Sequence, residues 1–185
     1  MTTKTVLKIF VVLLLFSGFV GTLPVYAADS AWVSKAPMQE ARCDLGVAVV
    51  NGKIYAIGGA GAKGFSSTNE EYDPATNIWT FRAPMPTPRS AFGIAVYKNK
   101  IYCFGGYTMT GTTGTATGVN EVYDPATNTW AKRASMPTAR LNIRANPVND
   151  KIYLIGGIPI LTRAEHSMRF MILQATPGQL KPMYR

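Results

Sequence analysis

The residue types that most often carry enzyme chemistry are scarce in this chain. It has a single histidine, His166, and two cysteines, Cys43 and Cys103. A Ser-His-Asp relay needs a histidine beside its nucleophile, and His166 lies in the C-terminal tail, outside the repeats described below. Zinc sites built on several His and Cys ligands are equally excluded. We therefore identify no catalytic residues, and we expect no metal and no cofactor.

Three arginines recur at matching places and are the best candidates for ligand binding. Arg42, Arg89 and Arg140 each stand at the start of a short apolar run. Several guanidinium groups that converge on one opening would suit carboxylates, sulfates or acidic peptides. In the alternative interpretation, each arginine caps carbonyl groups of a connecting loop and packs its stem. The sequence leaves both open.

The elements that position these arginines repeat along the chain. Residues 53–59, KIYAIGG, return at 100–106 as KIYCFGG and at 151–157 as KIYLIGG, and the Gly-Gly pairs are 47 and then 51 residues apart. Residues 72–79, YDPATNIW, return at 123–130 as YDPATNTW. A period of roughly 50 residues is typical of one four-stranded propeller blade. The structural positions of the repeat are Gly58, Gly59, Gly105, Gly106, Gly156, Gly157, Tyr72, Tyr123, Trp32, Trp79 and Trp130.

These motifs resemble the kelch family of β-propellers. The resemblance implies an all-β fold, a partial propeller with two complete four-stranded blades at about 42–82 and 89–133. Two strands of a third blade are expected at 140–157, and one orphan outer strand around Trp32. The kelch region as a whole spans 28–157.

Local signals within each repeat predict its turns. Asn51-Gly52 favours a two-residue hairpin, because both residues tolerate positive φ. Asn77 and Asn128 suit a left-handed residue before the strand that carries the tryptophan. The Gly-Gly pairs predict positive φ and close approach of another backbone.

The N-terminal 27 residues are predicted to be a signal peptide that forms a helix. Lys4 and Lys8 precede an apolar run at 9–20, and Pro24 follows it. The run is short of the roughly 20 residues that a membrane-spanning helix needs. The alternative is an uncleaved anchor, which would be the chain's one route to a membrane. We expect a secreted or cell-surface protein.

Export would place both cysteines in an oxidising compartment. In the blade arrangement Cys43 and Cys103 lie at the same end of neighbouring blades. A disulfide between them is one outcome, and two separate, half-buried thiols are the other.

The tail, residues 158–185, departs from the repeat and has neither Tyr-Asp-Pro nor tryptophan. Synonymous codons can be chosen for residues 168–178 so that the same nucleotides also encode a second peptide. Read from the third base of the first codon, they encode Glu-Val-Tyr-Asp-Pro-Ala-Ser-Asn-Thr-Trp. That peptide matches 121–130 at all but one residue. We therefore hypothesise a frameshift between 157 and 168, with a divergent C-terminus as the alternative. The nucleotide sequence of the gene decides between them.

Charge and composition limit the function further. The net charge of +9 is not gathered into a basic stripe, so we expect no nucleic-acid partner. The resemblance implies a binding module for protein or carbohydrate ligands. The alternatives are a sugar-modifying enzyme similar to the kelch-type sialic acid epimerase, or a nonfunctional truncated product. The copper site of the galactose oxidase relatives needs two histidines and is not carried over. An unclosed set of blades also predicts self-association through the open faces.

Overall fold

The computed structural model describes residues 32–159, 172–176 and 179–183, and it divides the chain into two compact units, Met1–Ser34 and Lys35–Arg185. The predicted signal helix at 1–27 lies outside the described residues. No helix occurs among those that are described, and so none there is long and apolar enough to cross a membrane.

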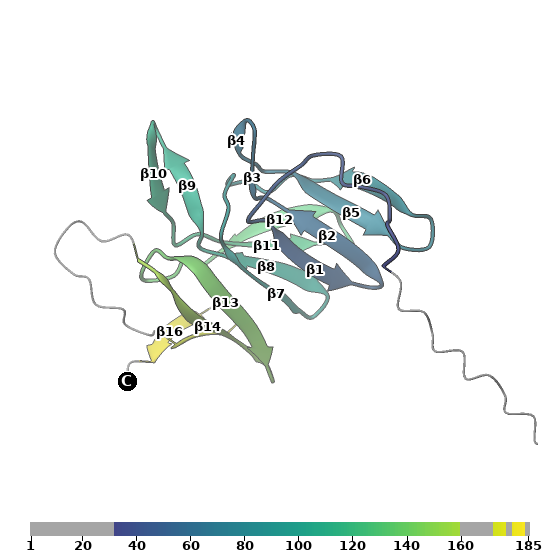
Figure 1. The fold of residues 1–185 in the computed structure, drawn as a ribbon. Coiled ribbons are helices and arrows are strands. Elements are labelled where there is room, and N and C mark those ends of the chain that lie inside the picture. The colour runs from purple at the N-terminus through teal and green to yellow at the C-terminus, as the bar shows by residue number, and fades with distance from the viewer. Residues whose placement is uncertain (1–31, 160–171, 177–178, 184–185) are drawn as a thin grey trace, which may run out of the picture. The chain divides into compact units, whose positions relative to one another are not determined.

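The second unit contains three four-stranded antiparallel sheets and two short hairpins (Figure 1), which confirms the predicted all-β class. Sheet 1 has the order β1-β2-β5-β6, sheet 2 the order β7-β8-β11-β12, and sheet 3 the order β13-β14-β15-β16. The bounds are β1 Gly46–Val50, β2 Lys53–Ile57, β5 Asn69–Asp73, β6 Ile78–Arg82, β7 Gly93–Tyr97, β8 Lys100–Phe104, β11 Asn120–Asp124, β12 Thr129–Arg133, β13 Leu141–Val148, β14 Lys151–Ile158, β15 Ile172–Thr176 and β16 Gln179–Met183.

Sheet 3 corrects the prediction of a two-stranded third blade. The tail supplies β15 and β16, and β15 pairs antiparallel with β14, with Leu154 opposite Leu173. Backbone pairing needs no particular side chain, so residues without the repeat motif still add strands to the edge of β14. Pro182 lies in β16, the edge strand of the sheet, and edge strands are where proline is tolerated. The frameshift remains a hypothesis, since strand formation does not depend on it.

The outer strand predicted around Trp32 is not formed. Residues 32–34 lie outside any strand, and the Trp32 side chain is fully exposed. A strand there would need partner strands in the same sheet. Each sheet that the structure describes takes its four strands from Gly46 onward.

The turns follow the local signals in the sequence. Asn51 and Gly52 have φ values of 50° and 74°, which are the positive values that the β1-β2 hairpin requires. Asn77 and Asn128 have φ values of 58° and 54°. Each of these two asparagines also accepts a hydrogen bond from the tyrosine hydroxyl five residues earlier, so turn and strand are fixed together.

The Gly-Gly pairs bring one sheet against the next. Gly59 N–H donates to the carbonyl of Arg89 (2.9 Å), and Gly106 N–H donates to the carbonyl of Arg140 (2.8 Å). A Cβ at Gly105 would lie 2.5 Å from the Arg140 carbonyl oxygen, closer than any side chain allows. The predicted close approach is therefore confirmed, and the neighbour is the arginine that begins the following repeat.

Two apolar cores lie between successive sheets. The first joins sheets 1 and 2, and its largest fully buried side chains include Ile57, Ile101 and Tyr123. The second joins sheets 2 and 3 through Phe104 and Leu154 among others. Each sheet therefore depends on its neighbour to cover one face, as in repeat proteins generally.

The repeated aromatic residues hold the outer strands in one recurring arrangement. The ring centroids of Tyr72 and Trp79 are 5.0 Å apart, and those of Tyr123 and Trp130 are 5.1 Å apart, at nearly the same tilt. The Trp130 indole N–H donates to the carbonyl of Ala83, 47 residues earlier (2.7 Å). Trp79 and Trp130 therefore occupy equivalent environments in successive sheets.

We expect Gly105→Ala to lower the free energy of unfolding by about 3 kcal/mol. About 1–2 kcal/mol comes from the left-handed backbone and about 1–2 kcal/mol from displacing the Arg140 carbonyl. Gly111→Ala is the matched control, because Gly111 has a similar φ (63° against 62°) and nothing within 4 Å of the added carbon. Its cost should be the backbone contribution alone, about 1–2 kcal/mol. Urea unfolding measures both, and equal losses would contradict the close approach.

Candidate binding surface

Two hairpins extend from the sheets directly after the Gly-Gly pairs. β3 (Ala60–Gly61) and β4 (Gly64–Phe65) follow sheet 1's second strand, and β9 (Tyr107–Thr110) and β10 (Thr113–Ala116) follow sheet 2's. Both project from the same side of their sheets (Figure 1). The Phe65 ring meets the Tyr107 ring edge-on, with centroids 5.5 Å apart. The segments that follow the first two Gly-Gly pairs are therefore ordered hairpins that contact each other.

The hairpins line two clefts. One, of about 450 Å³, lies between the hairpins and is bounded by Lys63, Phe65, Thr108 and Met109 among others. The other, of about 460 Å³, lies between the β3-β4 hairpin and the segment at Glu40. Both volumes are in the range of ligand pockets, and both clefts combine backbone, hydroxyl, charged and apolar groups.

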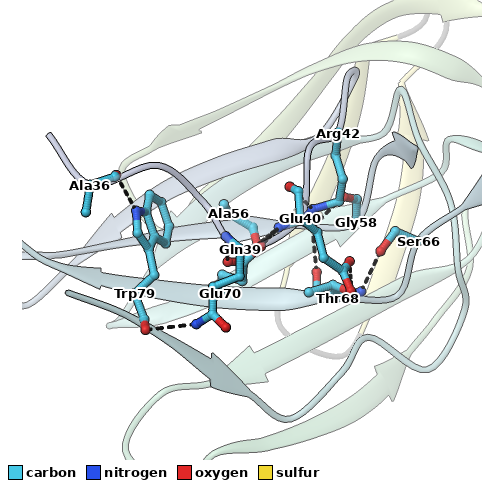
Figure 2. Close-up of polar contacts among 10 residues, drawn as sticks. All are labelled: Ala36, Gln39, Glu40, Arg42, Ala56, Gly58, Ser66, Thr68, Glu70 and Trp79. Atoms are coloured by element: carbon cyan, nitrogen blue, oxygen red, sulfur yellow. Dashed lines mark hydrogen bonds and ion pairs between the residues drawn. The ribbon is translucent and has the colours of Figure 1, made fainter. Parts of the chain in front are cut away.

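Arg42 is held inside sheet 1 rather than presented to a ligand (Figure 2). Its guanidinium donates to the carbonyl oxygens of Gly58 (2.7 Å) and Thr68 (3.0 Å) and to the Glu70 carboxylate (2.6 Å). Only 1% of the Arg42 side chain and none of the Glu70 side chain are exposed. The second Glu70 oxygen accepts from Gln39 N–H (2.7 Å). The segment before β1 is thereby fastened to the middle of the sheet.

Arg89 repeats this arrangement in sheet 2. It forms a fully buried ion pair with Glu121 at 2.5 Å and donates to the carbonyl of Cys103 (3.1 Å). Arg140 is also buried, and its contacts include the carbonyl oxygens of Gly156 (3.4 Å) and Gly157 (3.3 Å). Burial lowers the pKa of Arg140.

The structure therefore assigns these arginines the second of the two roles that the sequence left open. They cap carbonyl groups and tie each connecting segment to its sheet, and the side chains are buried rather than gathered at an open mouth. Sequence reasoning missed the paired carboxylates, Glu70 and Glu121. The signal was present, because these glutamates recur 51 residues apart beside the repeated Tyr-Asp-Pro motif.

Other titratable groups in the sheets are also engaged. Glu71 accepts from Tyr55 Oη (2.6 Å) and Arg82 Nη2 (2.8 Å); burial raises its pKa, but these hydrogen bonds outweigh burial and lower it overall. Burial, together with the bond to Glu71, raises the pKa of Tyr55. The Lys100 ammonium bonds Asp124 at 2.5 Å and lowers its pKa.

The disulfide considered for Cys43 and Cys103 is not formed. Both are free thiols, Cys43 exposed and Cys103 completely buried in the core between sheets 1 and 2. Burial raises the pKa of Cys103 to about 12. Within the described residues, no group of three or more His, Cys, Asp or Glu side chains is placed to hold a metal ion.

The sheets, their chain order and their mutual packing define a class, the β-propeller built from four-stranded units. A solved structure described as "Structure of YjhT" superposes on 86% of this chain with a TM-score of 0.69 at 17% identity, and 57% of that chain is matched. The family model described as the Kelch motif matches residues 41–86 and 88–137, more than half of the sequence. The chain therefore belongs to the kelch-repeat family.

Curated relatives carry the same repeats within longer proteins. The chain is 34% identical over 127 residues to "Kelch repeat and BTB domain-containing protein 1" of Ectromelia virus (strain Moscow). It is 32% identical over 127 residues to the protein of the same name from Cowpox virus (strain GRI-90 / Grishak). Each match covers 69% of this chain, which spans about a fifth of the relatives' own length (22%).

We expect Glu121→Ala to lower the free energy of unfolding by about 3–5 kcal/mol, because it leaves the Arg89 guanidinium buried without its counterion. The control is Arg82→Ala, which breaks the pair with Glu71, whose two side chains are 35% and 12% exposed. That change should cost about 1 kcal/mol or less. Urea unfolding compares the two variants. Similar losses of unfolding free energy would show that the buried pair stabilises the fold no more than the partly exposed pair does.

Proposed function

We propose that this kelch chain is a binding module that recognises a segment of another protein through its two hairpins. The observation that carries the proposal is the contact of the β3-β4 and β9-β10 hairpins, which places two clefts on one side of sheets 1 and 2. Hairpins are also where the repeat tolerates changes of length, as expected of recognition loops on a rigid scaffold.

The chemistry of the clefts suits an extended polypeptide. Lys63 and Met109 are exposed beside the half-buried Phe65 and Tyr107 rings, so charge and apolar surface alternate over a short distance. Ser66 and Ser67 add hydroxyl and backbone groups to the cleft beside Glu40. Interfaces of this mixed kind bind through a few aromatic anchors with a polar rim. Kelch repeats generally mediate protein interactions, which agrees with this choice.

The sugar-modifying alternative receives less support from the sheets. An ionisable pocket for that chemistry needs carboxylates that are open to a ligand. In the sheets, Glu70 and Glu121 are buried against arginine, and Asp73 and Asp124 are paired with lysine. Glu40, which lines one cleft and is exposed, accepts a hydrogen bond from the Thr68 hydroxyl (2.7 Å). A glycan ligand remains the competing outcome of the experiment below.

The test is selection of a phage-displayed random dodecapeptide library on the full chain, alongside a glycan array probed with the same protein. We expect peptides to be enriched. Binding of the best peptide should weaken about tenfold or more, roughly 1.4 kcal/mol, in the double variant Lys63→Ala/Met109→Ala. Isothermal titration measures the loss.

Lys98→Ala is the matched control, since Lys98 is an exposed lysine in the β7-β8 turn at the opposite end of sheet 2. It should leave the peptide affinity unchanged. Equal weakening by the control would place the site elsewhere. Glycan binding without peptide enrichment would replace the protein ligand by a carbohydrate.

We propose further that the module acts outside the cell, because residues 1–27 carry the pattern of a cleaved signal peptide. When the full chain is expressed in a secreting host, the product in the medium should begin at Ala28. Intact-mass measurement of that product is the check. A product that stays in the membrane fraction with Met1 intact would indicate the uncleaved anchor instead.

A further inference from the structure

Sheet 1 presents an open apolar face at its inner strand. Val47 and Val49 of β1 are 54% and 59% exposed. The matching residues of sheet 2, Ile94 and Val96, pack into the core against sheet 1. The cross-strand registers establish the match, because Val49 lies opposite Ile54 and Val96 lies opposite Ile101. We call Val47 and Val49 the front patch. In sheet 2, the residues at these positions, Ile94 and Val96, pack against the preceding sheet.

Sheet 3 presents the complementary open face. Ile155 is 42% exposed, although its counterparts in the other two sheets, Ile57 and Phe104, are completely buried. Val148 is 49% exposed, whereas its counterpart Val50 is 3% exposed. We call Ile155 and Val148 the rear patch. Its residues occupy the positions that, in sheets 1 and 2, receive the following sheet.

A backbone feature marks the rear patch in the same way. A Cβ at Gly105 would strike the carbonyl oxygen of Arg140, and one at Gly58 would strike that of Arg89 at 2.7 Å. At Gly156 it would meet nothing within 4 Å, although Gly156 keeps the same left-handed φ of 72°. Gly156 therefore keeps the backbone conformation with which Gly58 and Gly105 make room for an arginine carbonyl of the next sheet. Arg42 is the remaining member of the repeated arginine set, and it precedes the front patch.

The innermost residues of each sheet are also linked in series. Ala91 N–H donates to the carbonyl of Asp44 (2.9 Å), and Asn142 N–H donates to the carbonyl of Ala91 (2.7 Å). All three residues have φ values near 50–55°. The next bond of the series would run from an Asp44 N–H to an Asn142 carbonyl. Those two groups belong to opposite ends of the stack and meet only if a front patch adjoins a rear patch.

We propose that a second copy of this chain docks front patch to rear patch, so that two copies close one ring. Both halves of a sheet-to-sheet interface are present on the chain, and they are different surfaces, which makes the contact head-to-tail. Three sheets from each copy make six, within the four to eight of closed propellers.

The experiment measures the mass of the full chain in solution by light scattering across a dilution series. We expect twice the 20.1 kDa chain mass at high concentration. Val49→Asp and Ile155→Asp each place a charge in one patch at an exposed position. Each should give a monomer with an unchanged far-ultraviolet circular dichroism spectrum. Met109→Asp, an equally exposed apolar residue on the β9-β10 hairpin, is the control and should keep the dimer mass.

Mixing the two variants distinguishes this arrangement from a symmetric contact. Val49→Asp keeps an intact rear patch and Ile155→Asp keeps an intact front patch, so an equimolar mixture should recover a dimer through one interface. A wild-type chain that is monomeric at every concentration would overturn the proposal. Dimers that persist in the single variants, or a mixture that stays monomeric beside a dimeric wild type, would overturn it as well.

Discussion

The buried arginine–glutamate pair is the interaction on which the architecture depends. In sheets 1 and 2 the guanidinium comes from the segment that enters the sheet, and the carboxylate comes from its third strand. A buried ion pair contributes little net stability compared with apolar packing, because both ions lose their hydration. The pair instead determines position. Because the buried guanidinium has one available counterion, the connecting segment must cross the sheet where that carboxylate lies. In sheet 2 the carbonyl of the same arginine, Arg89, also accepts from Gly59 N–H of the preceding sheet, so this one residue joins two sheets.

Sheet 3 shows the same framework with different side chains. Leu173 stands opposite Leu154, the register position that Glu70 and Glu121 occupy opposite Ala56 and Cys103. The sheet still has four strands in the same order, since the ladder is made by the backbone. The strand order in this fold therefore tolerates sequence change. Anchoring of the connecting segment does not, because it needs an arginine and a glutamate at particular positions. That difference explains why a tail without the repeat motif still adds strands, although Leu173 stands at the register position of the repeated glutamate.

Much of the fold was predictable from the sequence, because the repeat carries its own local signals. Gly-Gly, Asn-Gly and Tyr-Asp-Pro act through backbone conformation over a few residues, and they identified β1, β2 and β5 with their counterparts in sheet 2. The arginine role was not resolved, because Arg42 and Glu70 meet across 28 residues and nothing local distinguishes a buried pair from a solvated one. The strands β15 and β16 were missed for the opposite reason: they follow ordinary strand pairing and carry no motif. The contact between the two hairpins could not be predicted, since it depends on the spacing of two sheets.

The bond from Gly59 to the carbonyl of Arg89 has a consequence for biosynthesis. Sheet 1 has all its strands once Arg82 has been added, yet its Gly-Gly corner and its apolar rear stay uncovered until the next repeat has been translated. Every such link runs to the sheet that follows, so ordering proceeds in the direction in which the ribosome delivers the chain. A nascent polypeptide of this type always carries one unfinished surface at its growing end. Shielding that moving surface is a task for chaperones, and its duration is set by the time needed to translate about fifty codons.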